Sequence, residues 1–209
     1  MKDNIVRDNT LKELRVMDML GEKKIYILLT DTGTVFTKMI KSFTKKPHNH
    51  ASIAFDADLK EVYSFGRKTP RNPFVGGFVR EDINSVLFRQ ADCAIYSLTI
   101  SNDDYHKMYR YIKGIECQKE CYRYNLLGLI GVLLNKPIKR KNAFFCSQFV
   151  ATVLDESMST NFGKDLSLVE PSDILLAADF ELVFEGRLRE YQYMNQLVQS
   201  PYPVVPVGM

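Results

Sequence analysis

Cys146 is the residue whose position in the sequence is best suited to chemistry. It follows two aromatic residues, and the apolar residues after it recur at helical spacing, at Phe149, Val150, Val153 and Leu154. We therefore expect Cys146 in the first turn of a buried helix, where free backbone N–H groups and the helix dipole stabilise a thiolate. The same N–H groups could receive the oxyanion of an attacked carbonyl. Free Cys is also a common core residue, so this segment alone leaves a purely structural role open.

A candidate base, His50, lies far upstream of Cys146. It opens a segment in which Ala51, Ile53 and Phe55 alternate with other residues, the period-two pattern of a strand. At the entry of a strand, an imidazole ring can face a cleft instead of the core. A Cys at a helix N-terminus that faces a His on a strand is the papain-type arrangement for acyl transfer. In this chain the His precedes the Cys, which reverses the order in papain.

The two segments together resemble the circularly permuted branch of the NlpC/P60 papain-like superfamily. The likeness is carried by His-Ala-Ser-Ile-Ala-Phe-Asp from His50 and by Phe-Phe-Cys-Ser-Gln-Phe-Val around Cys146. It extends from Ile25 to about Glu185. Relatives of this kind are the YiiX/YaeF-like permuted amidases and, more distantly, the lecithin:retinol-acyltransferase-like enzymes. The resemblance implies an α+β, permuted papain-like fold, with an antiparallel sheet packed against helices and a catalytic Cys/His pair.

The base of such a pair needs a third group, which holds its other ring nitrogen. In the permuted amidases this group usually comes from the strand after the His and is often a Glu. The matching position here is Ser64, whose hydroxyl can accept a hydrogen bond from an imidazole N–H but carries no charge. We therefore predict Ser64 as the third catalytic residue, with an ordinary strand Ser as the alternative. Glu61 is a fallback, although its odd spacing from Ser64 puts it on the opposite face of a regular strand.

These residues predict a thiol hydrolase or acyl transferase that acts on an amide or ester. Cys146 attacks the carbonyl, His50 takes the thiol proton and later protonates the leaving group, and Ser64 orients His50. The expected substrate is a small peptide, amide or lipid ester, and no cofactor is expected. The alternative is a non-enzymatic binding module that keeps the papain-like cleft, and such a module has no reason to keep an activated thiol.

Periodicity elsewhere predicts the elements that position these residues. Strands are expected at 25–29, 51–55, 61–65, 94–100 and 181–184, helices at 35–43, 105–112, 126–134 and after Cys146 and Pro171, and a long loop at 66–77. Ser101 and Asp104 form a predicted capping box. The apolar run 126–134 is too short to span a bilayer, and we interpret it as a buried helix, with a membrane-surface role as the less favoured alternative.

Composition indicates one ordinary globular domain at 21–190, with an accessory segment at 1–20 and a tail at 191–209. Of 209 residues, 45% are hydrophobic and 25% charged, and the net charge of +3 is scattered, so no nucleic-acid partner is expected. Segment 1–20 has no apolar h-region, which predicts a cytoplasmic location.

The other Cys and His residues are expected to be structural. Cys93, Cys117 and Cys121 are predicted to be reduced structural thiols. His48 and His50 could face one way on a strand, but no third ligand lies nearby in the sequence, so no metal site is expected.

Overall fold

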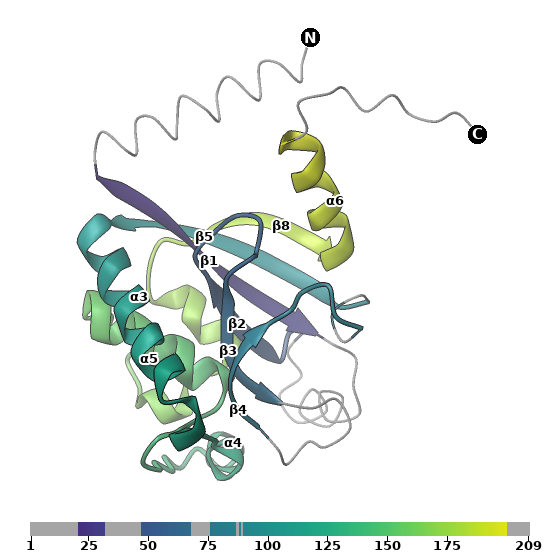
Figure 1. Ribbon diagram of the computed structural model, residues 1–209. Helices are drawn as coiled ribbons and strands as arrows, with labels where there is room; N and C mark the ends of the chain where they lie inside the picture. The colour runs from purple at the N-terminus through teal and green to yellow at the C-terminus, as the bar shows by residue number, and fades with distance from the viewer. Residues whose placement is uncertain (1–20, 32–46, 68–75, 87, 89, 200–209) are drawn as a thin grey trace.

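The computed structural model describes residues 21–31, 47–67, 76–86, 88 and 90–199 (Figure 1). Its centre is a six-stranded antiparallel sheet in the order β4-β3-β2-β1-β5-β8. The strands are β1 (Glu22–Asp31), β2 (His50–Ala54), β3 (Val62–Arg67), β4 (Gly76–Glu81), β5 (Asp92–Ser101) and β8 (Glu181–Arg187). The predicted segment 1–20, helix 35–43, most of the loop 66–77 and the end of the tail, 200–209, lie outside the described residues.

The central strand β1 is apolar on both faces because both faces are covered. Ile25, Ile27 and Leu29 belong to the core cluster beneath the helices, whereas Leu28 belongs to a second cluster with residues of β5 and α6 (Leu188–Gln199). Alternate residues of a strand point to opposite faces, so this run of large apolar side chains fills two cores at once. The sheet is therefore anchored at β1, the neighbour of β2, and β2 is the strand that carries His50.

Two helices cover one face of the sheet (Figure 1). In α3 (Asn102–Cys117), the N-cap half of the predicted capping box is confirmed, because the Ser101 hydroxyl accepts the backbone N–H of Asp104 at 3.1 Å. In α5 (Cys146–Met158), all four apolar residues that predicted the helix are fully buried. The other face is covered by α6, where Leu188 and Tyr191 are buried. This helix runs through residue 190, so the predicted boundary of the tail falls inside an element of the domain.

The remaining elements connect α3 to α5 and α5 to β8. They are the 3-10 helices η1 (Lys119–Cys121), η2 (Leu166–Leu168) and η3 (Pro171–Leu176), the short parallel strands β6 (Arg123–Tyr124) and β7 (Ala143–Phe144), and α4 (Leu126–Leu133). The prediction of a helix at 126–134 holds, but the prediction that it is buried is wrong. Its small residues make the packing contacts: a methyl group at Gly128 or Gly131 would lie within 2.5 Å of neighbouring atoms. Leu127, Ile130, Leu133 and the C-cap residue Leu134 consequently face outward and are 45–62% exposed.

The observed architecture is α+β, with an antiparallel sheet packed against helices, as the sequence predicts. The prediction fails at the edge of the sheet that β4 forms. The predicted loop 66–77 overlaps the start of β4, and no strand was expected at 76–81. Strand β4 has only one large, deeply buried apolar residue, Phe78, and opens with two glycines, so its local pattern is weak. Six residues of β4 pair with β3, and this pairing, more than the local sequence, makes the segment a strand.

Candidate active site

Cys146 begins α5 and is held in an environment that favours its thiolate. The residue at the N-cap is Phe145, which has no side-chain group to cap the helix. Backbone N–H groups of Ala51 and Ser147 donate instead to the Cys146 sulfur. Burial alone would raise the pKa of this thiol, but the charge and hydrogen bond of His50, together with these two N–H groups, lower it below its ordinary value. The thiol is only 3% exposed, so the reactive form is stabilised out of bulk water.

His50 lies between two acidic groups. It is the first residue of β2, and its Nε2 is 2.7 Å from Oε1 of Glu81. Its other partner is the sulfur of Cys146, which leaves Nδ1 to make that hydrogen bond. Burial lowers the pKa of the imidazole, but the charges and hydrogen bonds of Glu81 and Cys146 outweigh burial and raise it to about 10. The structure therefore brings the predicted Cys146–His50 pair together, with the imidazole protonated at neutral pH.

Glu81, at the end of β4, supplies the charge that the predicted site lacked. Its Oε1 accepts hydrogen bonds from His50 and, at 2.6 Å, from the hydroxyl of Ser64. Its Oε2 accepts the hydroxyl of Ser52 at 2.6 Å. Burial would raise the pKa of this carboxyl, but the His50 charge and the three hydrogen bonds lower it. Glu81 is thus an ionised carboxylate, with its side chain only 7% exposed.

The predicted role of Ser64 is corrected by these contacts. The expected hydrogen bond from His50 to Ser64 is replaced by one from His50 to Glu81, and Ser64 donates to that carboxylate. The sheet register explains the arrangement: Glu81 pairs with Val62, two residues from Ser64, so both side chains project from the same face. The fallback residue, Glu61, lies 3.9 Å from the ammonium group of Lys113 and is not part of the site.

Sequence reasoning missed Glu81 because its position depends on pairing between two strands. The resemblance places the third residue on the strand after the His, which is β3, whereas Glu81 lies on the following strand, β4. The local signal for that strand is weak, because two glycines open it and Phe78 and Val79 are followed by two charged residues, with no apolar–polar alternation. Without β4 in the predicted sheet, Glu81 could not be assigned to the site.

The site opens into a narrow, largely apolar cleft of about 60 Å³. Its walls come from the segment before β2, from β6 and α4, and from the starts of α5 and η3 with the residues before them. Its lining residues are His48, Asn49, Tyr124, Leu129, Val132, Leu133, Phe145, Cys146, Ser147, Val169, Glu170 and Pro171. A larger hollow of about 570 Å³ lies between 58–60, 80–84 and α6. That hollow is polar and contacts Glu81, but none of the described residues that line it is a Cys, Ser or His. We therefore locate the candidate site in the narrow cleft, which Cys146 lines.

The other Cys and His side chains have surroundings that differ from those of Cys146 and His50. All four cysteines are free, and burial, with the charge of Asp92, raises the pKa of Cys93 to about 12. Cys117 and Cys121 are exposed. His48 lines the cleft, whereas His106 is exposed on α3. Among the described residues, no group of three or more His, Cys, Asp or Glu side chains is arranged to hold a metal ion.

Comparisons of this chain with protein-family models, with curated proteins and with solved structures gave no match.

Proposed function

We propose that this protein is a cysteine hydrolase or acyl transferase of the permuted papain-like type, acting on an amide or ester. The observation that carries the proposal is the buried, hydrogen-bonded series of Cys146, His50 and Glu81, in which the pKa of the thiol is lowered and that of the imidazole is raised. The order of His before Cys, and the packing of the Cys helix on an antiparallel sheet, support the permuted papain-like assignment.

The reaction begins from the ion pair. The Cys146 thiolate attacks the carbonyl carbon, and the carbonyl oxygen becomes an oxyanion beside the free N–H groups at the start of α5. The tetrahedral intermediate collapses, the bond to the leaving amine or alcohol breaks, and His50 donates its Nδ1 proton to that group. The neutral imidazole then takes a proton from water, or from an acceptor alcohol or amine, as that group attacks the thioester. Cleavage of the thioester restores the thiolate and the imidazolium.

Glu81 makes this cycle more plausible than the predicted site did. A neutral Ser beside His50 would give no charge to stabilise the imidazolium. A carboxylate with three hydrogen-bond donors favours the protonated ring. A binding module gains nothing from a buried thiolate, which costs desolvation energy.

The test is the pH dependence of thiol alkylation. Iodoacetamide is added to the native protein at about pH 6, where a thiol of ordinary pKa is only about 0.3% ionised. We expect Cys146 to be labelled first, although Cys117 and Cys121 are exposed. An activated ester, p-nitrophenyl acetate, should then acylate Cys146, and mass spectrometry of the trapped acyl-enzyme identifies the site.

Two histidine variants provide the contrast. His50→Ala removes the imidazolium and should abolish the preference for Cys146, whereas His106→Ala removes an exposed imidazole on α3 and should leave it intact. Thermal melts check that both variants fold. Equal labelling of all four thiols at this pH, or unchanged labelling in His50→Ala, would contradict the proposal.

A further inference from the structure

Helix α4 presents three different faces. Gly128 and Gly131 form the inner face, packed closely on the side chains of Asn125 and Ile138. A second face lines the cleft of Cys146 with Leu129, Val132 and Leu133. The third face carries Leu127, Ile130, Leu133 and Leu134, at 45–62% exposure. Leu133 belongs to both the cleft and the exposed face, so the exposed apolar surface is continuous with the wall of the site.

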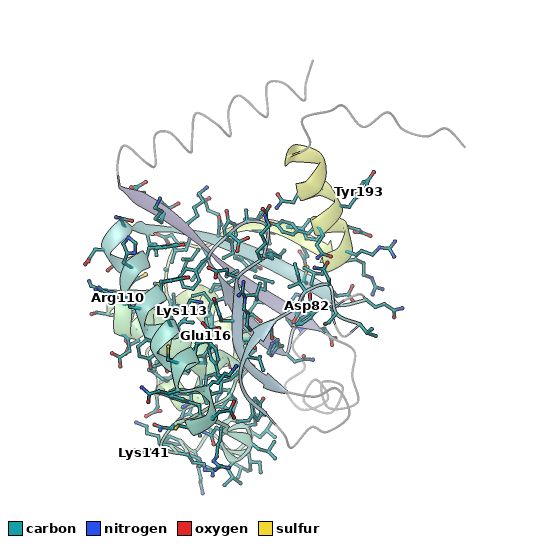
Figure 2. All side chains as sticks on the ribbon, viewed as in Figure 1. Asp82, Arg110, Lys113, Glu116, Lys141 and Tyr193 are labelled. Carbon is teal, nitrogen blue, oxygen red and sulfur yellow. The ribbon has the colours of Figure 1, made fainter. Side chains whose placement is uncertain are left out.

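A basic segment lies against this helix. The backbone N–H of Lys136 donates to the carbonyl of Gly131 at 2.8 Å, which turns the chain back beside α4. Four basic residues follow within six positions, at Lys136, Lys139, Arg140 and Lys141. All four are exposed, and Lys139 pairs with Asp165 at 2.7 Å. Lys141 lies at the same lower end of the molecule as α4 (Figure 2).

We propose that α4 and the segment 136–141 bind the surface of an anionic lipid bilayer, with the mouth of the cleft at the interface. Exposed leucines and isoleucine enter the boundary between headgroups and acyl chains, while the basic residues contact anionic headgroups. The inference rests on the proposed function in one respect, because it takes the ester-linked acyl chain of a membrane lipid as the substrate that reaches Cys146.

The charge pattern favours a bilayer over a second copy of this chain. No Asp or Glu occurs from 126 to 145. In a two-fold dimer the same patch meets itself, so the basic segments would repel each other. An anionic surface complements them. In the described part of the chain, no helix is long and apolar enough to cross a membrane. The eight residues of α4 extend only about 12 Å, so the helix lies along the surface.

The experiment is flotation of the full chain with vesicles of phosphatidylcholine alone or with added phosphatidylserine. Wild type should bind the phosphatidylserine vesicles more tightly. The double variant Lys136→Gln/Lys141→Gln should lose about 30-fold in partitioning to those vesicles, at roughly fivefold for each basic residue. The double variant Leu127→Ser/Ile130→Ser should lose at least about tenfold on both vesicle types. Neither pair includes a residue that lines the cleft.

Matched controls use exposed residues of the same types elsewhere. Val86→Ser changes an apolar residue that is 79% exposed, and Arg189→Gln removes an exposed cation on α6. Both should bind vesicles like wild type. Absence of wild-type binding, or equal losses in the controls, overturns the proposal, as does a concentration-dependent dimer that Leu127→Ser/Ile130→Ser dissolves.

Alkylation of Cys146 in vesicle-free solution separates this proposal from the proposed function. Preferential labelling without vesicle binding refutes only the docking surface. Vesicle binding without preferential labelling supports the docking surface and counts against the nucleophile. Retained labelling in the α4 and basic-segment variants shows that their loss of binding is not a loss of fold.

Discussion

Replacing Glu81 by Gln isolates the charge that distinguishes this site from the one predicted with Ser64. The amide keeps the shape of the side chain and its ability to hydrogen bond, but it removes the negative charge 2.7 Å from Nε2 of His50. Unit charges at that distance attract by about 6 kcal/mol at an effective dielectric constant of about 20. Both charges are delocalised, which lengthens their mean separation, and opposite charges in proteins typically shift a pKa by about 1–3 units. We expect the pKa of His50 to fall by roughly two units in Glu81→Gln.

The assay is NMR titration of the imidazole resonances, which is simple because the chain has three histidines. In the wild type, the pKa of His50 is raised from 6.5 to about 10, so the proton is retained through neutral pH. The stability that this proton gives is present below pH 6.5 and is lost as the pH rises through about 10. In Glu81→Gln, that loss should begin at lower pH. The matched control is Glu61→Gln, which removes a carboxylate near Lys113. An unchanged His50 titration in Glu81→Gln, or an equal fall in Glu61→Gln, would refute the reasoning.

Two further predictions concern the support of the site. Ser64→Ala removes one hydrogen bond to a buried carboxylate and should destabilise the protein by about 1.5–3 kcal/mol in thermal or urea unfolding, without lowering the pKa of His50. A lowered His50 pKa would instead favour the direct Ser64–His50 contact predicted from sequence. Gly128→Ala puts a methyl group 2.4 Å from Nδ2 of Asn125, the residue that caps α4, and should destabilise the protein by about 1–3 kcal/mol. The control is Gly114→Ala on the exposed side of α3, where the methyl group meets nothing within 4 Å and should stabilise the protein by about 0.5–1 kcal/mol. Equal unfolding midpoints for these two variants would show that α4 does not depend on close packing at Gly128.

The sequence predicts Cys146 and His50 as a pair because each is defined by a local pattern. Cys146 follows from the helical spacing after it, and His50 from the alternation after it, and neither needs information from another element. The prediction of a third residue requires the register between strands. Glu81 reaches His50 only because β4 pairs with β3 and aligns Glu81 with Val62. A short strand with two glycines gives little local evidence of that pairing, so the carboxylate remained unassigned.

The exposure of α4 was missed for a related reason. An apolar run such as 126–134 predicts burial when every large side chain is assumed to find a partner. Here the contacts are made by Gly128 and Gly131, which bring the helix too close to its neighbours for larger residues to share that face. Which face of a uniformly apolar helix packs inward depends on the shape of the surface beneath it, and periodicity alone carries no such information.

Burial does not by itself decide which thiol is reactive. Cys93 and Cys146 are both free and buried, yet the pKa of Cys93 is raised to about 12, whereas that of Cys146 is lowered. Cys93 has the carboxylate of Asp92 nearby, and Cys146 has an imidazolium and two backbone N–H groups. Desolvation acts in the same direction on both thiols, so the sign of the shift comes from the neighbouring charges and donors.

The same donors explain how three charges can share a buried site. In the proposed ion pair, thiolate, imidazolium and carboxylate sum to one negative charge, which would be costly in the interior without further compensation. Neutral donors supply it: two backbone N–H groups at the sulfur and the hydroxyls of Ser52 and Ser64 at the carboxylate. Each anion is thus held by His50 and by two dipoles fixed in secondary structure. Loss of one hydroxyl leaves the anion with its other partners, whereas loss of the His50 charge leaves both anions without their shared positive charge, so charge-removing variants should affect Cys146 far more than hydroxyl-removing ones.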